Sequence, residues 1–245
     1  MVGRLLTSLT GRIALVTGAT RGLGRAIAIG LARQGAHVIC TGRTVGALEE
    51  LDDAIKSNGG HATLAPFDLR EGQGIEQLSS SIAQRWGRLD MLAGNAGVLG
   101  DLTPVQDISA RHWDEAFAIN VTANWRLIRS CHALLRASDA GRAVFVTSSA
   151  AAAAKPFWGL YATTKAALET LVRTYAHETA TTPIRVNLVS PGPLRTAMRA
   201  KAMPGENAAQ LRAPKAIVPD ILMLLSPAET RHGEIIDLRE AGQAR

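Results

Sequence analysis

The stretch TGATRGLG at residues 17–24 decides the fold, because its three glycines separate a strand pattern from a helix pattern. The apolar run IALV precedes it at residues 13–16, and Leu23, Ile27 and Leu31 follow at the spacing of a helix. Glycines let the main chain approach a ligand, and the first turn of a helix offers unpaired amides. An ordinary tight turn is the alternative, but this order of elements favours a site for the pyrophosphate of a dinucleotide.

Apolar segments rich in β-branched residues alternate with helical patterns along the chain, which predicts an α/β protein. Strands that are apolar almost throughout are typical of a parallel sheet with helices on both faces. We therefore expect a doubly wound Rossmann-type fold with a roughly seven-stranded parallel sheet. The predicted strands are residues 12–17, 36–41, 61–65, 89–93, 143–147, 184–189 and 234–238.

No linker or internal repeat divides the sequence, so residues 1–245 are expected to form a single NAD(P)-binding domain. The segment 191–214 is the least regular, with Pro193, Pro204 and Gly205 among alanines and methionines. Such a segment is typical of a mobile insertion near a ligand. We expect it to form a substrate loop.

The composition excludes several classes of protein. Hydrophobic residues make up 47% and charged residues 20% of the 245 positions, as in a folded globular chain. The net charge of +6 comes from dispersed residues and only 4% of the chain is aromatic, so no nucleic-acid partner is expected. An anionic small molecule or cofactor is the better match for this charge.

The sequence also predicts where the protein works. Cys40 and Cys131 are too few and too far apart for a disulfide framework, which favours a reducing, cytoplasmic setting. The first ten residues lack the core of a signal peptide, and no apolar stretch approaches the roughly 20 residues of a membrane helix. The six histidines are scattered, so no metal site is expected.

The end of the second predicted strand indicates which dinucleotide binds. An Asp or Glu at this place accepts hydrogen bonds from the ribose hydroxyls of NAD, but no acidic residue occurs between Gly18 and Glu49. Arg43 and, from the glycine turn, Arg21 could instead pair with the 2′-phosphate of NADP. We expect NADP(H) to be preferred, with NAD(H) possible; the alternative is that both arginines only face solvent.

Tyr161 and Lys165 are four residues apart, so a phenol and an ammonium share one helix face. A nearby cation favours the phenolate and would lower the pKa of the tyrosine toward the range of a working acid or base. Ser148 follows the strand 143–147, where a doubly wound sheet opens its ligand crevice, and its hydroxyl could hold a carbonyl oxygen. A solvated helix and a plain loop serine are the alternatives, and Ser149 competes with Ser148.

Over essentially its whole length the chain resembles the short-chain dehydrogenase/reductase family. Six motifs carry the resemblance, in the family's order and approximate spacing. They are the glycine motif at 17–24, Asn-Ala-Gly at 95–97, Asn120, Ser148, Tyr161 with Lys165, and Pro191-Gly192 with Thr196. One departure is Gly94, where the family usually has a second asparagine, so one side-chain hydrogen bond near the end of the fourth strand is expected to be missing.

The resemblance implies an NAD(P)(H)-dependent oxidoreductase that reduces a ketone or 3-oxoacyl group to an alcohol, or runs in reverse. Tyr161 would give the proton, Ser148 would orient the carbonyl, and Lys165 would bind the nicotinamide ribose and lower the tyrosine pKa. Asn120 would hold a water that connects the lysine to solvent. The residues implied in cofactor binding are Gly18, Thr20, Arg21, Gly22, Leu23, Arg43, Asp68, Leu69, Asn95, Ala96, Gly97, Tyr161, Lys165, Pro191, Gly192 and Thr196.

The resemblance also implies which segments surround the substrate, and that the chain forms a homodimer or homotetramer. The segments 98–102, 150–160 and 193–212 are largely apolar, which favours a hydrophobic carbonyl compound. An acyl carrier is the alternative, because the last segment holds the cations Arg195, Arg199, Lys201 and Arg212. Two rival functions remain: a nucleotide-sensing regulator, and a scaffold whose cofactor is structural.

Overall fold

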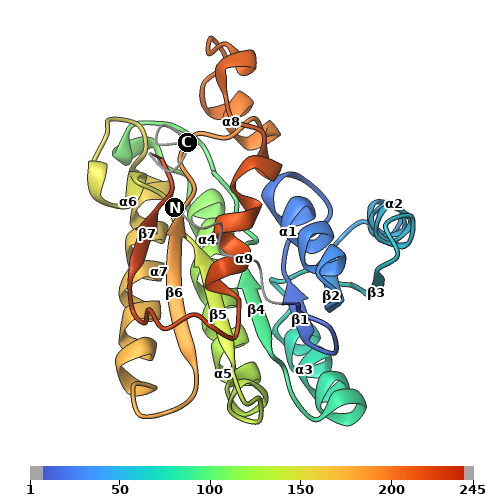
Figure 1. Cartoon of the computed structure of the whole chain (residues 1–245). Coiled ribbons are helices and arrows are strands. Elements are labelled where there is room, and N and C mark those ends of the chain that lie inside the picture. The colour runs from blue at the N-terminus through green and yellow to red at the C-terminus, as the bar shows by residue number, and fades with distance from the viewer. Residues whose placement is uncertain (1–7, 240–245) are drawn as a thin grey trace, which may run out of the picture.

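A seven-stranded parallel sheet forms the centre of the molecule (Figure 1). The computed structural model describes residues 8–239, and its strand order is β3-β2-β1-β4-β5-β6-β7. All neighbouring strands run parallel, as the sequence predicts, and each predicted strand is present with its ends shifted by at most two residues. The strands are β1 (Ile13–Val16), β2 (His37–Gly42), β3 (His61–Pro66), β4 (Met91–Gly94), β5 (Arg142–Val146), β6 (Arg185–Ser190) and β7 (Ile235–Asp237).

Helices cover both faces of this sheet. Helices α1 (Gly22–Arg33), α2 (Val45–Lys56) and α9 (Val218–Leu224) share one hydrophobic core with the sheet. A second core lies under α3 (Gly72–Trp86), α5 (Ala123–Arg136) and α7 (Gly159–Glu178). The remaining helical elements are α4 (Ala110–Phe117), α6 (Ala150–Ala153), α8 (Ala197–Ala202), η1 (Val105–Asp107), η2 (Ala118–Thr122), η3 (Ala208–Gln210) and η4 (Pro214–Ile217).

The two cores explain why the strands are apolar throughout. Successive side chains of a strand point to opposite faces of the sheet. In β1, Ala14 and Val16 accordingly belong to the first core, whereas Ile13 and Leu15 belong to the second. No position of this strand reaches solvent, so every position is apolar.

The strand order reverses at β1, which lies between β2 and β4. The chain first builds outward to β3, then returns to the other side of β1 and continues to β7. The loops after β1 and β4 therefore leave in opposite directions and open a crevice at the carboxyl edge of the sheet.

Segment 191–214 contains regular elements, which its composition did not predict. It holds α8 and η3, and a bridge between Leu194 and Arg212 ties its two ends together. The helix begins at Thr196, whose hydroxyl accepts a hydrogen bond from the Arg199 amide. In Figure 1 this segment extends beyond the carboxyl edge of the sheet.

Some expectations concern residues outside the described range. The ends of the predicted domain, residues 1–7 and 240–245, lie there, and so does most of the N-terminal stretch that argues against export. Within residues 8–239, no helix combines the length and the apolar character that crossing a bilayer requires.

A buried carboxylate joins three segments at the amino edge of the sheet. Asp90 is 1% exposed and accepts hydrogen bonds from the Ile13 amide at 2.8 Å and from the Ser138 hydroxyl at 2.6 Å. The guanidinium groups of Arg12 and Arg88 each lie 3.2 Å from it. Without the carboxylate the Ile13 amide and the Ser138 hydroxyl would lose this acceptor, and a buried donor without a partner is costly, whereas Arg12 and Arg88 would keep contacts to Asp139 and to the Gly11 carbonyl.

We predict that Asp90→Ala lowers the free energy of unfolding by about 3 kcal/mol, the usual cost of breaking a buried ion pair from one side. Urea denaturation measures this value. Asp139→Ala is the matched control, because Asp139 also pairs with Arg12 but its side chain is 73% exposed, so little change is expected. Equal losses in the two variants would contradict the role given to Asp90.

Candidate active site

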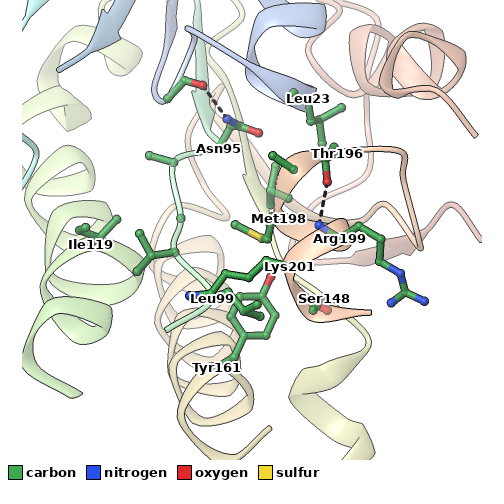
Figure 2. A pocket seen from close by; sticks show the side chains of 18 of the residues that line it. Leu23, Asn95, Leu99, Ile119, Ser148, Tyr161, Thr196, Met198, Arg199 and Lys201 are labelled. Carbon is green, nitrogen blue, oxygen red and sulfur yellow. Dashed lines mark hydrogen bonds between the residues drawn. The ribbon is translucent and has the colours of Figure 1, made fainter. Parts of the chain in front are cut away.

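A cleft of about 1230 Å³ lies at the carboxyl edge of the sheet, where the strand order reverses. Its walls come from the segments after β1, β2, β4, β5 and β6, together with the first two turns of α7 and with α8. Figure 2 shows side chains from these segments pointing toward one another. With one exception, Asn120, every site residue that the sequence predicts lines this cleft.

The glycine turn has the geometry that a pyrophosphate needs. Gly18 and Gly22 have φ angles of 62° and 57°, which favour glycine. A Cβ atom on Gly24 would lie 2.3 Å from the Gly18 carbonyl oxygen, so only glycine allows the helix to start this close. Arg21 precedes α1, and no side chain caps the first amides of this helix. These amides and the positive end of the helix dipole suit an anionic ligand.

Asn95 and Thr17 hold the ends of β1 and β4 together beneath the turn. The Asn95 side chain donates to the Thr17 carbonyl at 2.9 Å, and the Thr17 hydroxyl accepts from the amides of Asn95 and Ala96. Ala96 and Gly97 then continue along the cleft wall. The Asn-Ala-Gly motif thus shapes the floor of the nucleotide end of the cleft.

Gly94 departs from the family pattern for a steric reason. A Cβ atom at this position would lie 2.3 Å from the ring of Phe145, which is fully buried in the neighbouring strand β5. The large ring therefore occupies the space where a side chain at position 94 would begin. This explanation needs the pairing of β4 with β5, which the motif alone does not contain.

Arg21, in the glycine turn, and Arg43, after β2, both line the cleft at the end away from Tyr161. The Arg43 side chain is 59% exposed, and its nearest acidic group is Asp68, at 3.9 Å. Asp68 is held more closely by Arg70 at 2.6 Å, and this hydrogen bond lowers the pKa of the carboxyl group. Asp68 and Leu69 form the adjoining wall. The two arginines, Arg21 and Arg43, thus place two cationic side chains at this end of the cleft.

Ser148, Tyr161 and Lys165 meet at the inner end of the cleft. Helix α7 places the tyrosine and the lysine one turn apart, and both are buried, at 8% and 3% exposure. The Lys165 ammonium donates to the Val146 carbonyl at 2.8 Å and lies 5.7 Å from the centre of the Tyr161 ring. The Ser148 hydroxyl lies close enough to the tyrosine to lower its pKa in part, and Figure 2 shows the two side chains at the same end of the cleft.

Burial controls the ionisation of this pair. It raises the pKa of Tyr161 to about 12, although the hydrogen bond with Ser148 lowers it in part. It lowers the pKa of Lys165 to about 8, against the charge of Glu169, which raises it. We expected the Lys165 ammonium to lower the tyrosine pKa, but burial is the largest influence on this group and raises its pKa.

Asn120 lies behind the cleft wall. It is fully buried in the π-helical turn η2, and its side chain bonds both the amide and the carbonyl of Val98 and also the Thr164 hydroxyl. Its carbonyl accepts a hydrogen bond from Asn124. The side chain thus joins the loop after β4 to α7, a few residues from Lys165, and stabilises the wall from behind.

The segment after β6 forms a further wall of the cleft. Gly192 has a φ of 72°, and Pro191, Gly192 and Thr196 all line the cleft. The bond from the Arg199 amide to the Thr196 hydroxyl fixes the start of α8 (Figure 2). A Cβ atom on Gly22 would touch the Thr196 methyl group at 3.6 Å, so this segment meets the glycine turn directly.

The structure adds residues that sequence reasoning missed. His112 and Glu115 of α4 line the cleft, although no local motif marks them. The small apolar cluster around the tyrosine, by contrast, lies in the segments 98–102, 150–160 and 193–212 that the sequence indicates, and its Trp158 ring centre is 6.1 Å from that of Tyr161. The other members of this cluster are Leu99, Leu102, Ala150 and Ala202.

We predict that Tyr161 and Tyr175, the two tyrosines of the chain, remain protonated in the folded protein at pH 10, where an exposed tyrosine is half ionised. Their folded pKa values lie above the unfolded value. The stability they contribute is therefore fully present below pH 10 and is lost as the pH rises through about 12 for Tyr161. Ultraviolet difference absorbance measures the phenolate, with urea-unfolded protein as control. Half ionisation of the folded protein at pH 10 would refute the prediction.

Comparison with known proteins gives consistent results. The family model for short chain dehydrogenases matches residues 12–207. The uncharacterized oxidoreductase YciK of Escherichia coli is 36% identical over 91% of this chain and 89% of its own length. A solved structure from Escherichia coli, described as a short chain dehydrogenase complexed with NADPH, has a TM-score of 0.92 at 36% identity. The alignment covers 96% of this chain and 99% of that one.

A structure from Shigella flexneri, described as a short chain dehydrogenase complexed with NADP, is equally similar. It has a TM-score of 0.92 at 36% identity, and the alignment covers 96% of this chain and all of the other. The family match begins at the first strand, includes the glycine turn, Ser148 and Tyr161, and ends at residue 207, within segment 191–214. The chain therefore belongs to the short-chain dehydrogenase family.

Proposed function

We propose that the chain is an NADP(H)-dependent oxidoreductase that reduces a ketone to an alcohol. The observation that carries the proposal is the meeting of Ser148 and Tyr161 at the buried end of a cleft whose other end is the glycine turn. One cleft can thus hold a dinucleotide and bring its reactive ring to the two hydroxyl groups. The NADP and NADPH complexes of the two similar structures support this choice of cofactor.

Each residue then has a chemical task. The bound cofactor would supply the hydride. Tyr161 would give its proton to the carbonyl oxygen, and a pKa of about 12 keeps that proton on the ring at neutral pH. The Ser148 hydroxyl would orient the carbonyl group and stabilise its developing charge. Lys165, held by the Val146 carbonyl, would bind the ribose next to the reactive ring.

The charge at the nucleotide end supports NADP(H) over NAD(H). Helix α2 begins at Val45, and the cleft wall around the end of β2 consists of Thr41, Gly42, Arg43 and Thr44, which include no carboxylate. Arg43 and Arg21 offer guanidinium groups that can bond a phosphate at two points.

The inner end of the cleft supports a neutral, apolar substrate over an acyl carrier. Trp158 and the apolar cluster around Tyr161 form this end. Three of the four cations in segment 191–214 already have partners in the chain. Arg199 pairs with Glu206, Lys201 donates to the Gly100 carbonyl, and Arg212 donates to the carbonyls of Pro191 and Leu238. An acyl carrier would have to break these contacts or bind without the three cations.

We also propose that the chain works as a homo-oligomer in the cytoplasm. Trp113 of α4 and Trp125 of α5 are 39% and 44% exposed, and large aromatic side chains are enriched at protein interfaces. Cys40 and Cys131 are free and buried, which suits a reducing compartment.

We predict that Tyr161→Phe lowers the rate of NADPH oxidation with ketones about a hundredfold or more, the contribution of one positioned proton donor. The dissociation constant for NADPH should change little, because the ring and its packing remain. Steady-state absorbance measures turnover, and NADPH fluorescence measures binding. Undiminished turnover in this variant, or no turnover of the wild type across a panel of ketones and quinones, would refute the proposal.

We predict that Arg43→Asp moves the ratio of kcat/KM for NADPH to kcat/KM for NADH toward NADH by about tenfold, the factor expected from one lost charge-assisted hydrogen bond. Arg33→Asp is the control, because Arg33 is also an exposed arginine but bonds Asn58 away from the cleft. The same ratio in all three proteins would contradict the role given to Arg43.

A further inference from the structure

Three consecutive residues at the end of β5 contact three side chains on one face of α7. The Val146 carbonyl accepts from Lys165 at 2.8 Å, and Ser148 lies near enough to Tyr161 to lower its pKa in part. Between them, the Thr147 hydroxyl donates to a Glu169 carboxylate oxygen at 2.6 Å. Tyr161, Lys165 and Glu169 follow one another at four-residue intervals, so they occupy successive turns of one helix face.

The contact between Thr147 and Glu169 is built into the interior. Thr147 is 1% exposed, so its hydroxyl has no access to bulk water, and the Glu169 carboxylate accepts its hydrogen bond. A buried hydroxyl without an acceptor is costly, and a hydrogen bond to a carboxylate is stronger than one between neutral groups. Glu169 thereby holds the residue that directly precedes Ser148.

The same carboxylate acts on Lys165. The ammonium is buried, and burial alone disfavours its charged form. Glu169 lies one turn further along α7, and its negative charge raises the lysine pKa against this effect. A carboxylate four residues from a lysine is within the range of side-chain pairing on a helix.

We propose that Glu169 is a positioning residue for the reaction: its hydrogen bond with Thr147 fixes the strand end that leads to Ser148, and it places a carboxylate one helical turn from the Lys165 ammonium. This inference rests on the proposed function only where it refers to turnover. The Tyr-x3-Lys pair is thereby extended to Tyr-x3-Lys-x3-Glu, in which Lys165 and Glu169 bond Val146 and Thr147 and Tyr161 lies near Ser148.

Other charged groups around α7 have different partners or lie elsewhere. On α4, His112 pairs with Asp101 and Glu115 lies near Arg70, while Arg111 and Asp114 are exposed. On β6, Arg185 donates to the carbonyls of Thr182 and Ile184, at the amino end of that strand. His132 of α5 bonds Tyr175, and η2 and α6 carry no charged residue. Within α7, Arg173, His177 and Glu178 lie at least two turns beyond Lys165.

The first test measures the lysine directly and needs no turnover. The chain contains five lysines, so protein labelled with carbon-13 at the lysine ε position gives few NMR signals, and Lys165→Arg assigns the relevant one. We expect the wild-type midpoint to lie below that of an ordinary lysine, and Glu169→Gln to move it to still lower pH. Glu178→Gln is the matched control, because it removes an exposed glutamate from the same helix and should leave the midpoint unchanged. Equal midpoints in Glu169→Gln and Glu178→Gln would overturn the role of the charge.

The second test separates the charge from the hydrogen bond. Thr147→Val removes the hydrogen bond and keeps the carboxylate, so kcat should fall about tenfold, as expected for losing one hydrogen bond to a charged group, while the Lys165 midpoint stays. Glu169→Asp keeps the charge on a shorter side chain and should restore the midpoint relative to Glu169→Gln. In Glu169→Gln the alkaline limb of the kcat/KM profile should move to lower pH, because the ammonium is lost earlier.

The outcomes distinguish this inference from the proposed function. If the wild type reduces no carbonyl compound, the proposed function fails, and the NMR midpoints still decide whether Glu169 acts on Lys165. If the wild type is active but Thr147→Val and Glu169→Gln keep its kcat and its pH profile, the positioning role of Glu169 is refuted. Thermal unfolding of each variant shows whether a loss of kcat reflects a loss of fold.

Discussion

The hydrogen bond from the buried Lys165 ammonium to the Val146 carbonyl is the contact on which the site depends. An ammonium removed from water needs an acceptor, and among the described residues the carboxyl end of β5 provides it. This requirement fixes α7 against β5 at one register. Because Tyr161 lies one turn before the lysine and Ser148 lies two residues after Val146, the same register brings the two hydroxyl groups together. Catalytic geometry thus follows from satisfying one buried charge.

Burial also sets the chemical character of this pair. Desolvation opposes charge on both groups, so it raises the pKa of Tyr161 and lowers that of Lys165. A tyrosine that keeps its proton suits the proposed reduction, in which Tyr161 would act as the acid. Ser148 and Glu169 oppose these shifts from the two sides, the first by a hydrogen bond to the phenol and the second by its charge. The balance between burial and these polar influences, rather than the spacing of the motif, sets the pKa values of Tyr161 and Lys165.

The two ends of the cleft follow different physical rules. At the nucleotide end, glycines at positions 18, 22 and 24 allow the backbone to come close, and the unpaired amides of α1 favour an anion. At the substrate end, an apolar cluster excludes water around Tyr161, and the cations of the neighbouring segment are mostly paired within the chain. The contacts between Asn95 and Thr17 join the two ends of the cleft. They fix the end of β4 to the glycine turn, and the loop that follows β4 leads to the end where Tyr161 lies.

The sequence by itself determined the seven strands, their parallel sheet and the position of the glycine turn, because strand periodicity and glycine spacing are local properties of the chain. It also indicated many of the residues that line the cleft, through short motifs and through the segments that the family resemblance places around the substrate. Only the tertiary structure decided that Phe145 excludes a side chain at position 94, that Asn120 lies behind the cleft wall, and that His112 reaches the cleft. It also reversed the expected pKa shift of Tyr161, because desolvation depends on what packs around a group, and those neighbours come from distant segments.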